Sequence, residues 1–368
     1  MRRNIASATT ARKATISSTP VRLGFVPLND CAPLVVAQEH GLFERFGVEV
    51  RLSRELGWAT IRDKIVHGEL DAAHAPCGLP LALELGLSCV PTRTVAGMVL
   101  NLNGNAITLS EELWSAGIRD ALTLRAFLTG NRGRRTLTFG TVSPYSTHTL
   151  LLRRWLTQAG ADFGRDVRFV VVPPQQMVVN LAAGHLDGFC AGEPWNSLAV
   201  AEGCGWIPAT SSDLAPLHPE KVLLATADFA ARRENEHVRI IAALLEACAF
   251  CDSPANQPAL AKLLSDRRYL GQPAEVIARG FPGEFNYGHG LHSPLADFVV
   301  YHREAANVPT PEKAAWIARH LLDGAARDKF SAEQLAQIFR ADLFAKAQEL
   351  RLATIPHDPD SETRLLTA

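Results

Sequence analysis

The chain has 368 residues, and its 37 Lys and Arg residues nearly balance its 38 Asp and Glu residues, which leaves a formal charge of -1. This balance, together with the lack of any block of like charges, argues against a protein that binds nucleic acid or a membrane electrostatically. Apolar residues make up 47% and charged residues 20%, which is typical of folded globular proteins and excludes disordered and collagen-like chains. At about 100–200 residues per domain, the length predicts two or three domains.

The N-terminal segment and the cysteines bear on the cellular compartment. Residues 1–20 are basic and rich in Ser and Thr, but they lack the run of about 7–15 apolar residues of a signal peptide. We expect a disordered leader there, with a twin-arginine export signal at Arg2 and Arg3 as the alternative. The chain also lacks a run of about 20 apolar residues that would span a membrane. Because seven scattered cysteines are typical of reduced thiols, we predict a cytoplasmic protein.

From position 21 onward, short β-branched runs alternate with helical patterns, which predicts α/β units around a parallel sheet. The first set of predicted elements comprises strands at 21–27, 48–53, 71–75 and 92–100 and helices at 32–45, 59–67 and 79–85. A polar turn at 101–105 is expected to close this set. The second set comprises strands at 136–142 and 167–173 and helices at 147–158, 175–183 and from 194 onward.

A strand at 221–226 is expected to return the chain to the first set of elements. Apolar spacing of 3.6 residues then predicts helices at 235–250, 257–264, 311–322 and 332–349. The predicted domains are lobe I at 21–105 and 224–350, lobe II at 106–223, and a flexible tail at 351–368. This organisation predicts an α/β clamp of two lobes with a ligand cleft between them, a preferred location for small-molecule sites.

Three places along the chain offer donors to an anion. Trp58 directly precedes a predicted helix that has Thr60 in its first turn, so the free N–H groups of the helix start and the indole N–H point to an anion site. His148 lies in the first turn of another predicted helix, and Lys221 begins the return strand. One cation among neutral donors suits a small monovalent oxyanion, because two or three cations would over-neutralise it.

Each of these features also has a purely structural explanation. Trp58 could pack a loop into the core, His148 could be exposed on a capping segment, and Lys221 could be solvated at a strand start. Asn105 and His74 are weaker candidates for the site. For His74, which lies in a short apolar strand, a satisfied core histidine is the competing interpretation.

The chain contains, in this order, the segments LGFVPLNDCAPLVVAQEHGLF, GWATIRD, LDAAH, LNLNGN, STHTLLLRRWL, VVVPPQQMVVNLAAGHLDGFCAGEPWN and HPEKVLL. In order and spacing they resemble the nitrate- and bicarbonate-binding proteins of the NrtA/CmpA type. The resemblance covers about residues 21–350. It implies a type II periplasmic-binding-protein-like fold that holds nitrate or nitrite in the cleft between its lobes.

The resemblance also implies the ligand contacts. Trp58, His148 and Lys221 match residues that contact nitrate in the family. Asn105 stands where the transporter proteins are expected to have a glutamine, and Thr149 supplies a neighbouring backbone donor. The residues expected just behind these contacts are Thr60, His74 and Glu193.

The bicarbonate branch of the family uses acidic residues and a calcium ion near its ligand. Glu193 leaves this alternative open, but the chain shows no cluster of oxygen ligands at a spacing that calcium would demand. We therefore expect neither a metal nor a cofactor.

The exported members of the family are lipoproteins with a signal peptide and a lipobox cysteine, which this chain lacks. In this respect it resembles the cytoplasmic nitrate/nitrite sensors of the NasS type, which hold an RNA-binding antiterminator of the NasT type inactive until the anion arrives. The resemblance implies a sensor with that protein partner and without direct contact to nucleic acid or membrane. The alternative is the substrate-binding component of a nitrate ABC transporter.

A cysteine-dependent desulfinase is the enzymatic alternative on the same fold. Cys31 lies between the first strand and a helix start, where the helix dipole lowers a thiol pKa, and His74 would be its base. However, Cys31 also belongs to the anion-binding motif and no arginine stands beside His74, so we expect no enzyme. Cys248 and Cys251 form a C-x-x-C pair without a second ligand pair, which favours core packing over a metal or redox role.

Overall fold

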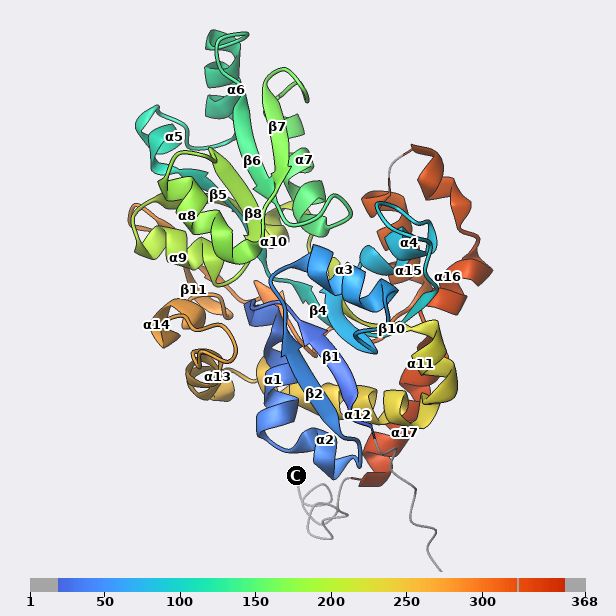
Figure 1. Ribbon diagram of the computed structural model, residues 1–368. Coiled ribbons are helices and arrows are strands. Elements are labelled where there is room, and N and C mark those ends of the chain that lie inside the picture. Colours follow the sequence, from blue (N-terminus) through green and yellow to red (C-terminus); the bar gives the residue numbers. More distant parts are fainter. Residues whose placement is uncertain (1–18, 323, 355–368) are drawn as a thin grey trace, which may run out of the picture.

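The computed structural model describes residues 19–322 and 324–354, and within them the chain forms two lobes, each built on its own sheet (Figure 1). Most of the leader predicted at 1–20 lies outside the described residues. So does the predicted tail beyond 354, whereas residues 351–354 of that tail continue helix α17 (Ala341–Thr354). In the described part of the chain, no helix combines the length and the apolar character needed to cross a bilayer.

The first sheet has six strands in the order β13-β4-β10-β3-β1-β2. They are β1 (Val21–Phe25), β2 (Val50–Arg54), β3 (Ala72–Pro76), β4 (Thr94–Asn103), β10 (Pro219–Thr226) and β13 (Val299–Val300). β1 pairs in parallel with β2 and β3, whereas β10 runs antiparallel to β3 and β4. Every residue of β3 and β4 is buried, because helices cover this sheet and its central strands meet apolar neighbours on both faces.

The second sheet has five strands in the order β7-β6-β8-β5-β9. They are β5 (Asn105–Ser110), β6 (Leu137–Thr141), β7 (Val167–Val171), β8 (Gly188–Gly192) and β9 (Gly205–Thr210). β6 is parallel to β7 and β8, and β5 is antiparallel to β8 and β9. Each sheet thus joins three parallel strands to an antiparallel strand that arrives from the other lobe. The predicted two-lobed periplasmic-binding-protein-like fold is confirmed.

Helices pack around both sheets. Those formed before β5 and after β10 are α1 (Ala32–Glu39), α2 (Leu42–Arg45), α3 (Trp58–Val66), α4 (Leu79–Glu84), α11 (Ala227–Arg232), α12 (Glu234–Asp252), α13 (Gln257–Leu264), α14 (Ala274–Ala278), α15 (Pro311–Leu321), α16 (Ala332–Ile338) and α17. Those formed between them are α5 (Glu111–Ser115), α6 (Ala121–Gly130), α7 (Thr147–Gln158), α8 (Met177–Ala182), α9 (Trp195–Ala201) and α10 (Ser211–Leu214). Single 3-10 turns occupy η1 (Asn29–Cys31), η2 (Pro174–Gln176) and η3 (Pro254–Asn256), and η4 (Gly324–Lys329) is longer.

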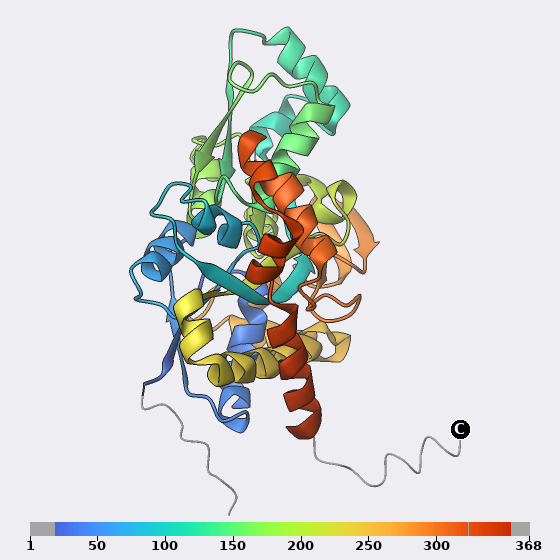
Figure 2. The ribbon, with the colours of Figure 1, turned by 90° about the vertical axis from the view of Figure 1, so that its right-hand side faces the viewer.

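The longest helix, α12, lies in the core of the first lobe. Ile240, Ile241 and Leu244 are fully buried, and α12 packs between α1 and α17, as expected of a helix that is apolar around most of its circumference. Figure 2 shows the C-terminal helices running along one side of the molecule. There α15 contacts α7 of the second lobe and α17 contacts β4 of the first, so these helices touch both lobes.

The chain turns sharply at the two crossings that flank the second lobe. β4 ends at Asn103 (φ 57°) and Gly104 (φ 100°) separates it from β5, while Leu217 (φ 56°) lies shortly before β10. A φ in this left-handed range favours glycine, which explains Gly104. Residues at the ends of elements, like those at these crossings, are where hinge motions are commonly absorbed.

The structure differs from the predicted organisation at several points, of which three bear on the two lobes. The polar turn predicted at 101–105 is shorter than expected, because residues 101–103 end β4 and residue 105 begins β5, so the turn is confined to Asn103 and Gly104. The predicted lobe boundary at 223/224 falls inside β10, which pairs along its length in the first sheet. Residues 283–295 were assigned to lobe I from the sequence. In the structure they form a hairpin of β11 (Gly283–Gly288) and β12 (Leu291–Leu295), which lies against β9 of the second lobe.

Candidate anion-binding site

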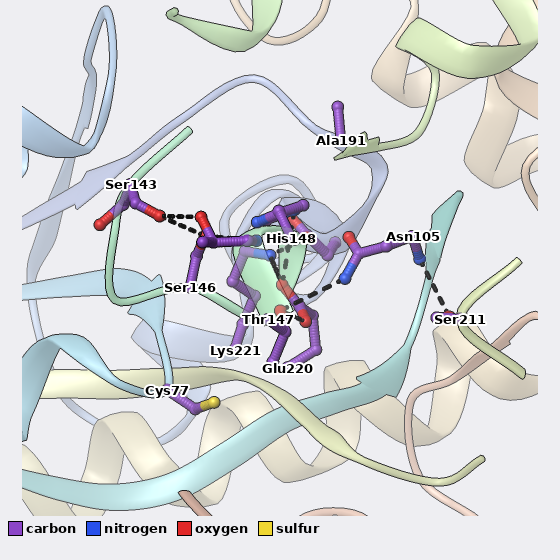
Figure 3. Close-up of polar contacts among 12 residues, drawn as sticks. Cys77, Asn105, Ser143, Ser146, Thr147, His148, Ala191, Ser211, Glu220 and Lys221 are labelled. Atoms are coloured by element: carbon purple, nitrogen blue, oxygen red, sulfur yellow. Dashed lines mark hydrogen bonds and ion pairs between the residues drawn. The ribbon is translucent and has the colours of Figure 1, made fainter. Parts of the chain in front are cut away.

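Polar side chains converge where the parallel strands of both sheets end, the usual place for a ligand in α/β folds. Asp30 lies in η1 after β1, Trp58 begins α3, and His148 lies in the first turn of α7 after β6. Glu220 and Lys221 come from β10. Figure 3 shows His148, Glu220 and Lys221 close together, so the second lobe supplies the histidine and the first lobe the charged pair.

Lys221 is the cation at the centre of the site, and it is fully buried. Its Nζ lies 2.7 Å from Oδ2 of Asp30 and 2.5 Å from Oε1 of Glu220. The same nitrogen is 5.6 Å from the centroid of the Trp58 ring. Burial alone would lower the pKa of Lys221, but the charges of Asp30 and Glu220 outweigh burial and raise it, so Lys221 stays positively charged.

Glu220 is bonded from both lobes. The hydroxyl of Thr147 donates to Oε2, and Nε2 of His218 lies 3.1 Å from the same oxygen. Burial acts to raise the pKa of Glu220, but the charge of Lys221 prevails and holds it well below its usual range. Glu220 is therefore a buried carboxylate, which links Thr147 of α7 to Lys221 of β10.

His148 is fully buried in the first turn of α7. The helix starts here because Ser146 is its N-cap, whose hydroxyl oxygen accepts from the backbone N–H of Thr149. Nε2 of His148 lies 3.7 Å from Oε1 of Glu220, and neither ring nitrogen has a hydrogen-bond partner among the described residues. Burial lowers the pKa of His148 to about 4, so the ring is neutral at neutral pH.

His74 and Trp58 form one wall of the site. Nε2 of His74 lies 2.8 Å from Oδ1 of Asp30, and its ring centroid is 5.2 Å from that of Trp58. Burial lowers the pKa of His74, whereas the pKa of Asp30 is lowered against the effect of burial by the charge of Lys221. The buried indole N–H of Trp58 has no hydrogen-bond partner in the described part of the chain, so it can donate to a ligand.

Asn105 is buried at the crossing between the lobes. Its side-chain N–H donates to the Thr147 hydroxyl at 3.4 Å, and its backbone N–H donates to the Ser211 hydroxyl at 3.3 Å (Figure 3). The Thr149 hydroxyl donates to the carbonyl oxygen of Ser143 at 2.8 Å, and its backbone N–H, the donor expected for the ligand, lies 3.5 Å from the hydroxyl oxygen of Ser146 that caps α7. The structure therefore brings Asn105 to the site, while both Thr149 donors have partners in the segment before α7.

Thr60 and Glu193, which were also expected just behind the ligand contacts, have different surroundings. Thr60 is half-buried on α3. Glu193 is buried directly after β8, and its Oε2 accepts from the backbone N–H of Ser197 at 3.0 Å. Burial raises the pKa of Glu193 to about 7. Among the described residues, no group of three or more His, Cys, Asp and Glu side chains is arranged to hold a metal ion.

Asp30 and Glu220 were not predicted as site residues. The sequence had led us to expect one cation among neutral donors. Asp30 could have been found from its place directly after the first strand. Glu220 could not, because successive side chains alternate between the faces of a regular strand. The pairing of β10 with β4 shifts register on both sides of Lys221, and this irregularity lets two successive side chains reach one site.

The two lobes are closed over the site. The backbone N–H of Asn29 donates to the carbonyl oxygen of Glu193 at 2.7 Å, and the indole N–H of Trp195 donates to that of Pro27 at 3.3 Å. The side chains that contact one another in this site expose at most a few per cent of their surface to solvent. The site is therefore enclosed by both lobes.

Comparison with known proteins places the chain in a family. A family model described as NMT1-like matches residues 14–265. The chain belongs to this family. The nitrate/nitrite binding protein NrtA of Nostoc sp. is 30% identical over 352 residues, which cover 93% of this chain and 79% of that protein. The predicted membership of the NrtA/CmpA type is confirmed.

Two further comparisons extend this result. The crystal structure of the periplasmic nitrate-binding protein NrtA from Synechocystis superposes with a TM-score of 0.84 at 28% identity and covers 93% of this chain and 92% of that one. The nitrate import ATP-binding protein NrtC of Synechocystis sp. is 39% identical over 330 residues, which are 88% of this chain but 49% of that protein. This NMT1-like chain thus spans about half the length of the ATP-binding relative.

The desulfinase alternative finds no support at Cys31. The residue is fully buried, and burial raises the pKa of its thiol far above the ordinary value, so the reactive thiolate is disfavoured. His74, the base suggested for it, faces Asp30 instead. The relatives described above are named as a nitrate/nitrite binding protein and a nitrate import ATP-binding protein, which agrees with the expectation that this NMT1-like chain is not a desulfinase.

Proposed function

We propose that the protein binds nitrate or nitrite between its lobes and acts as the substrate-binding component of a nitrate import system. The observation that carries this proposal is the meeting of Lys221 and Trp58 from the first lobe with His148 from the second, at a site buried by lobe closure. An ammonium, an indole N–H and an imidazole are donors suited to a flat, singly charged oxyanion. The NrtA relatives, named for nitrate and nitrite binding, support this choice of ligand.

Lobe closure gives the ligand its affinity. The indole N–H of Trp58 and the ring of His148 are buried without hydrogen-bond partners among the described residues, and leaving such groups unpaired costs about 1–3 kcal/mol each. An anion that accepts from them removes this cost. The closed form is therefore stabilised by the ligand, and a transport partner can distinguish loaded from unloaded protein.

The first prediction concerns the choice of anion. Nitrate and nitrite carry one charge, whereas sulfate brings a second charge to a site that already holds the carboxylates of Asp30 and Glu220. We expect isothermal titration calorimetry on anion-stripped protein to show binding of nitrate and nitrite and none of sulfate. Tight binding of sulfate or bicarbonate without any heat from nitrate would rule out the proposed ligand.

A second proposal for the same anion site is the cytoplasmic sensor with an RNA-binding antiterminator as its partner. This proposal rests on the resemblance of the sequence to sensors of the NasS type, whereas the relatives are named for nitrate binding and nitrate import and do not bear on an antiterminator partner. In a sensor, the partner would bind one lobe orientation better than the other.

The partner can be tested through its response to nitrate. If closure on nitrate weakens a partner complex, the partner must weaken nitrate binding by the same factor. We expect that a complex captured from nitrate-free lysate, with its components identified by mass spectrometry, releases an RNA-binding protein when nitrate is added. Lys221→Ala protein should retain that partner. Capture of a permease and location outside the cytoplasm would select the import component instead.

A further inference from the structure

The buried site holds more negative than positive charge. The carboxylates of Asp30 and Glu220 both contact the ammonium of Lys221, and all three groups are almost completely shielded from solvent. Since these two negative charges face one positive charge, the three groups together carry one negative charge at neutral pH. A bound nitrate would add a second negative charge to a region where uncompensated charge is costly.

His148 is the group that can compensate the added negative charge by taking up a proton. Its Nε2 lies 3.7 Å from Oε1 of Glu220, and both ring nitrogens lack a hydrogen-bond partner in the described part of the chain. The charged and titratable groups that act on it are Glu220 and Lys221 of β10, Asp30 of η1, and His218, which precedes β10. Of these, Glu220 and Asp30 favour the protonated ring, whereas Lys221 and His218 oppose it.

The number of protons on the ring decides what His148 can bind. A neutral imidazole has one N–H, whereas the Glu220 carboxylate and nitrate both only accept hydrogen bonds. A ring between two such acceptors satisfies both only if each nitrogen carries a proton. We propose that the protein takes up one proton with each nitrate and that His148 carries it, an inference that rests on the proposed function because it requires nitrate beside His148.

The coupling has a defined sign. Nitrate binds the protonated ring better, so it raises the pKa of His148 above the value of about 4 that burial gives it in the closed arrangement. By linkage, nitrate binding is strongest at low pH and weakens as the pH rises above the pKa of His148 in the nitrate-free protein. The affinity for nitrate stops falling once the pH exceeds the pKa that His148 has in the nitrate complex. Where it falls most steeply, Kd rises about tenfold per pH unit.

The experiment is calorimetry of nitrate binding to the full chain, from about pH 5 to about pH 8, the range in which histidines commonly titrate. At each pH, two buffers with different ionisation enthalpies give the number of protons taken up. We expect uptake approaching about one proton per nitrate, with the affinity falling as the pH rises. His148→Gln retains one side-chain N–H donor but cannot take the proton, so it should bind nitrate more weakly, without proton uptake and with a flat pH profile.

Two matched variants test the assignment to His148. His237 on α12 is also buried, with a pKa lowered to about 4 by burial, and it lies beside Phe229. His237→Gln should therefore leave proton uptake unchanged. Glu193→Gln should do so too, although burial raises the pKa of Glu193 to about 7. Loss of proton uptake in Glu193→Gln but not in His148→Gln would assign the proton to Glu193 and overturn the inference.

Glu220→Gln provides a second test of proton uptake, in which His148 itself is unchanged. It removes one carboxylate, so a neutral His148 can give its single N–H to nitrate, and proton uptake should fall. Urea unfolding of each variant shows whether it is folded. Nitrate binding without proton uptake in the unmodified protein overturns this inference and leaves the receptor proposal standing, whereas no nitrate binding at any pH overturns both.

Discussion

Lys221→Ala is expected to abolish useful nitrate binding and also to destabilise the protein. Loss of the cation that faces a buried anion should weaken binding by about 2–5 kcal/mol. The sequence alone suggests an intact fold in this variant, but Asp30 and Glu220 both contact Lys221. Removing one member of a buried ion pair costs about 3–5 kcal/mol, so the free energy of unfolding should fall by a similar amount. Calorimetry with nitrate and urea unfolding measure the two effects.

Two variants separate binding from stability. Asn105→Ala removes a neutral hydrogen bond at the same site and should cost about 0.5–1.5 kcal/mol in nitrate binding. The double variant Glu220→Gln and Lys221→Met removes one charge of each sign, so it should regain part of the stability while nitrate binding stays lost. If Lys221→Ala and Asn105→Ala weaken nitrate equally, the decisive charge lies elsewhere and the proposed site is misplaced.

Much of the fold could be predicted from local patterns in the sequence. Helices α7 (Thr147–Gln158) and α13 (Gln257–Leu264) have the predicted bounds, because apolar spacing and terminal residues mark them clearly. Strand β5 (Asn105–Ser110) was missed because it begins with a buried asparagine that reads as part of a polar turn. Its pairing with β8 and β9 is set by residues far along the chain, which a local pattern does not contain.

The hydrogen-bond donors of the site could be predicted from the sequence, but its net charge could not. Trp58, His148 and Lys221 were expected from the family resemblance, and the structure brings them together; their roles as nitrate contacts stay predictions. The two carboxylates on Lys221 depend on the strand irregularity in β10 and on the position of η1, both of which are tertiary features. The charge balance, and with it the role of His148, therefore becomes visible only in three dimensions.

Gly78→Ala is expected to weaken nitrate binding without changing any group at the site. Gly78 is the N-cap of α4 in the first lobe, and a Cβ there would lie 2.3 Å from the carbonyl oxygen of Tyr145 in the second lobe. Its φ of -82° suits alanine, so the strain arises between the lobes and not within the turn. Relief of the clash separates the lobes, at a cost typical of overpacking, about 1–3 kcal/mol.

This cost falls on the closed form alone, so calorimetry should show nitrate affinity lowered by about tenfold or more. Small-angle scattering should show a larger radius of gyration for the variant than for the unmodified protein at the same nitrate concentration. Gly130→Ala is the matched control, since Gly130 ends α6 and a Cβ there meets no atom within 4 Å among the described residues. Equal nitrate affinity in the two variants would mean that binding does not require the closed lobe arrangement, because the added methyl group at position 78 cannot be accommodated while the lobes stay as they are.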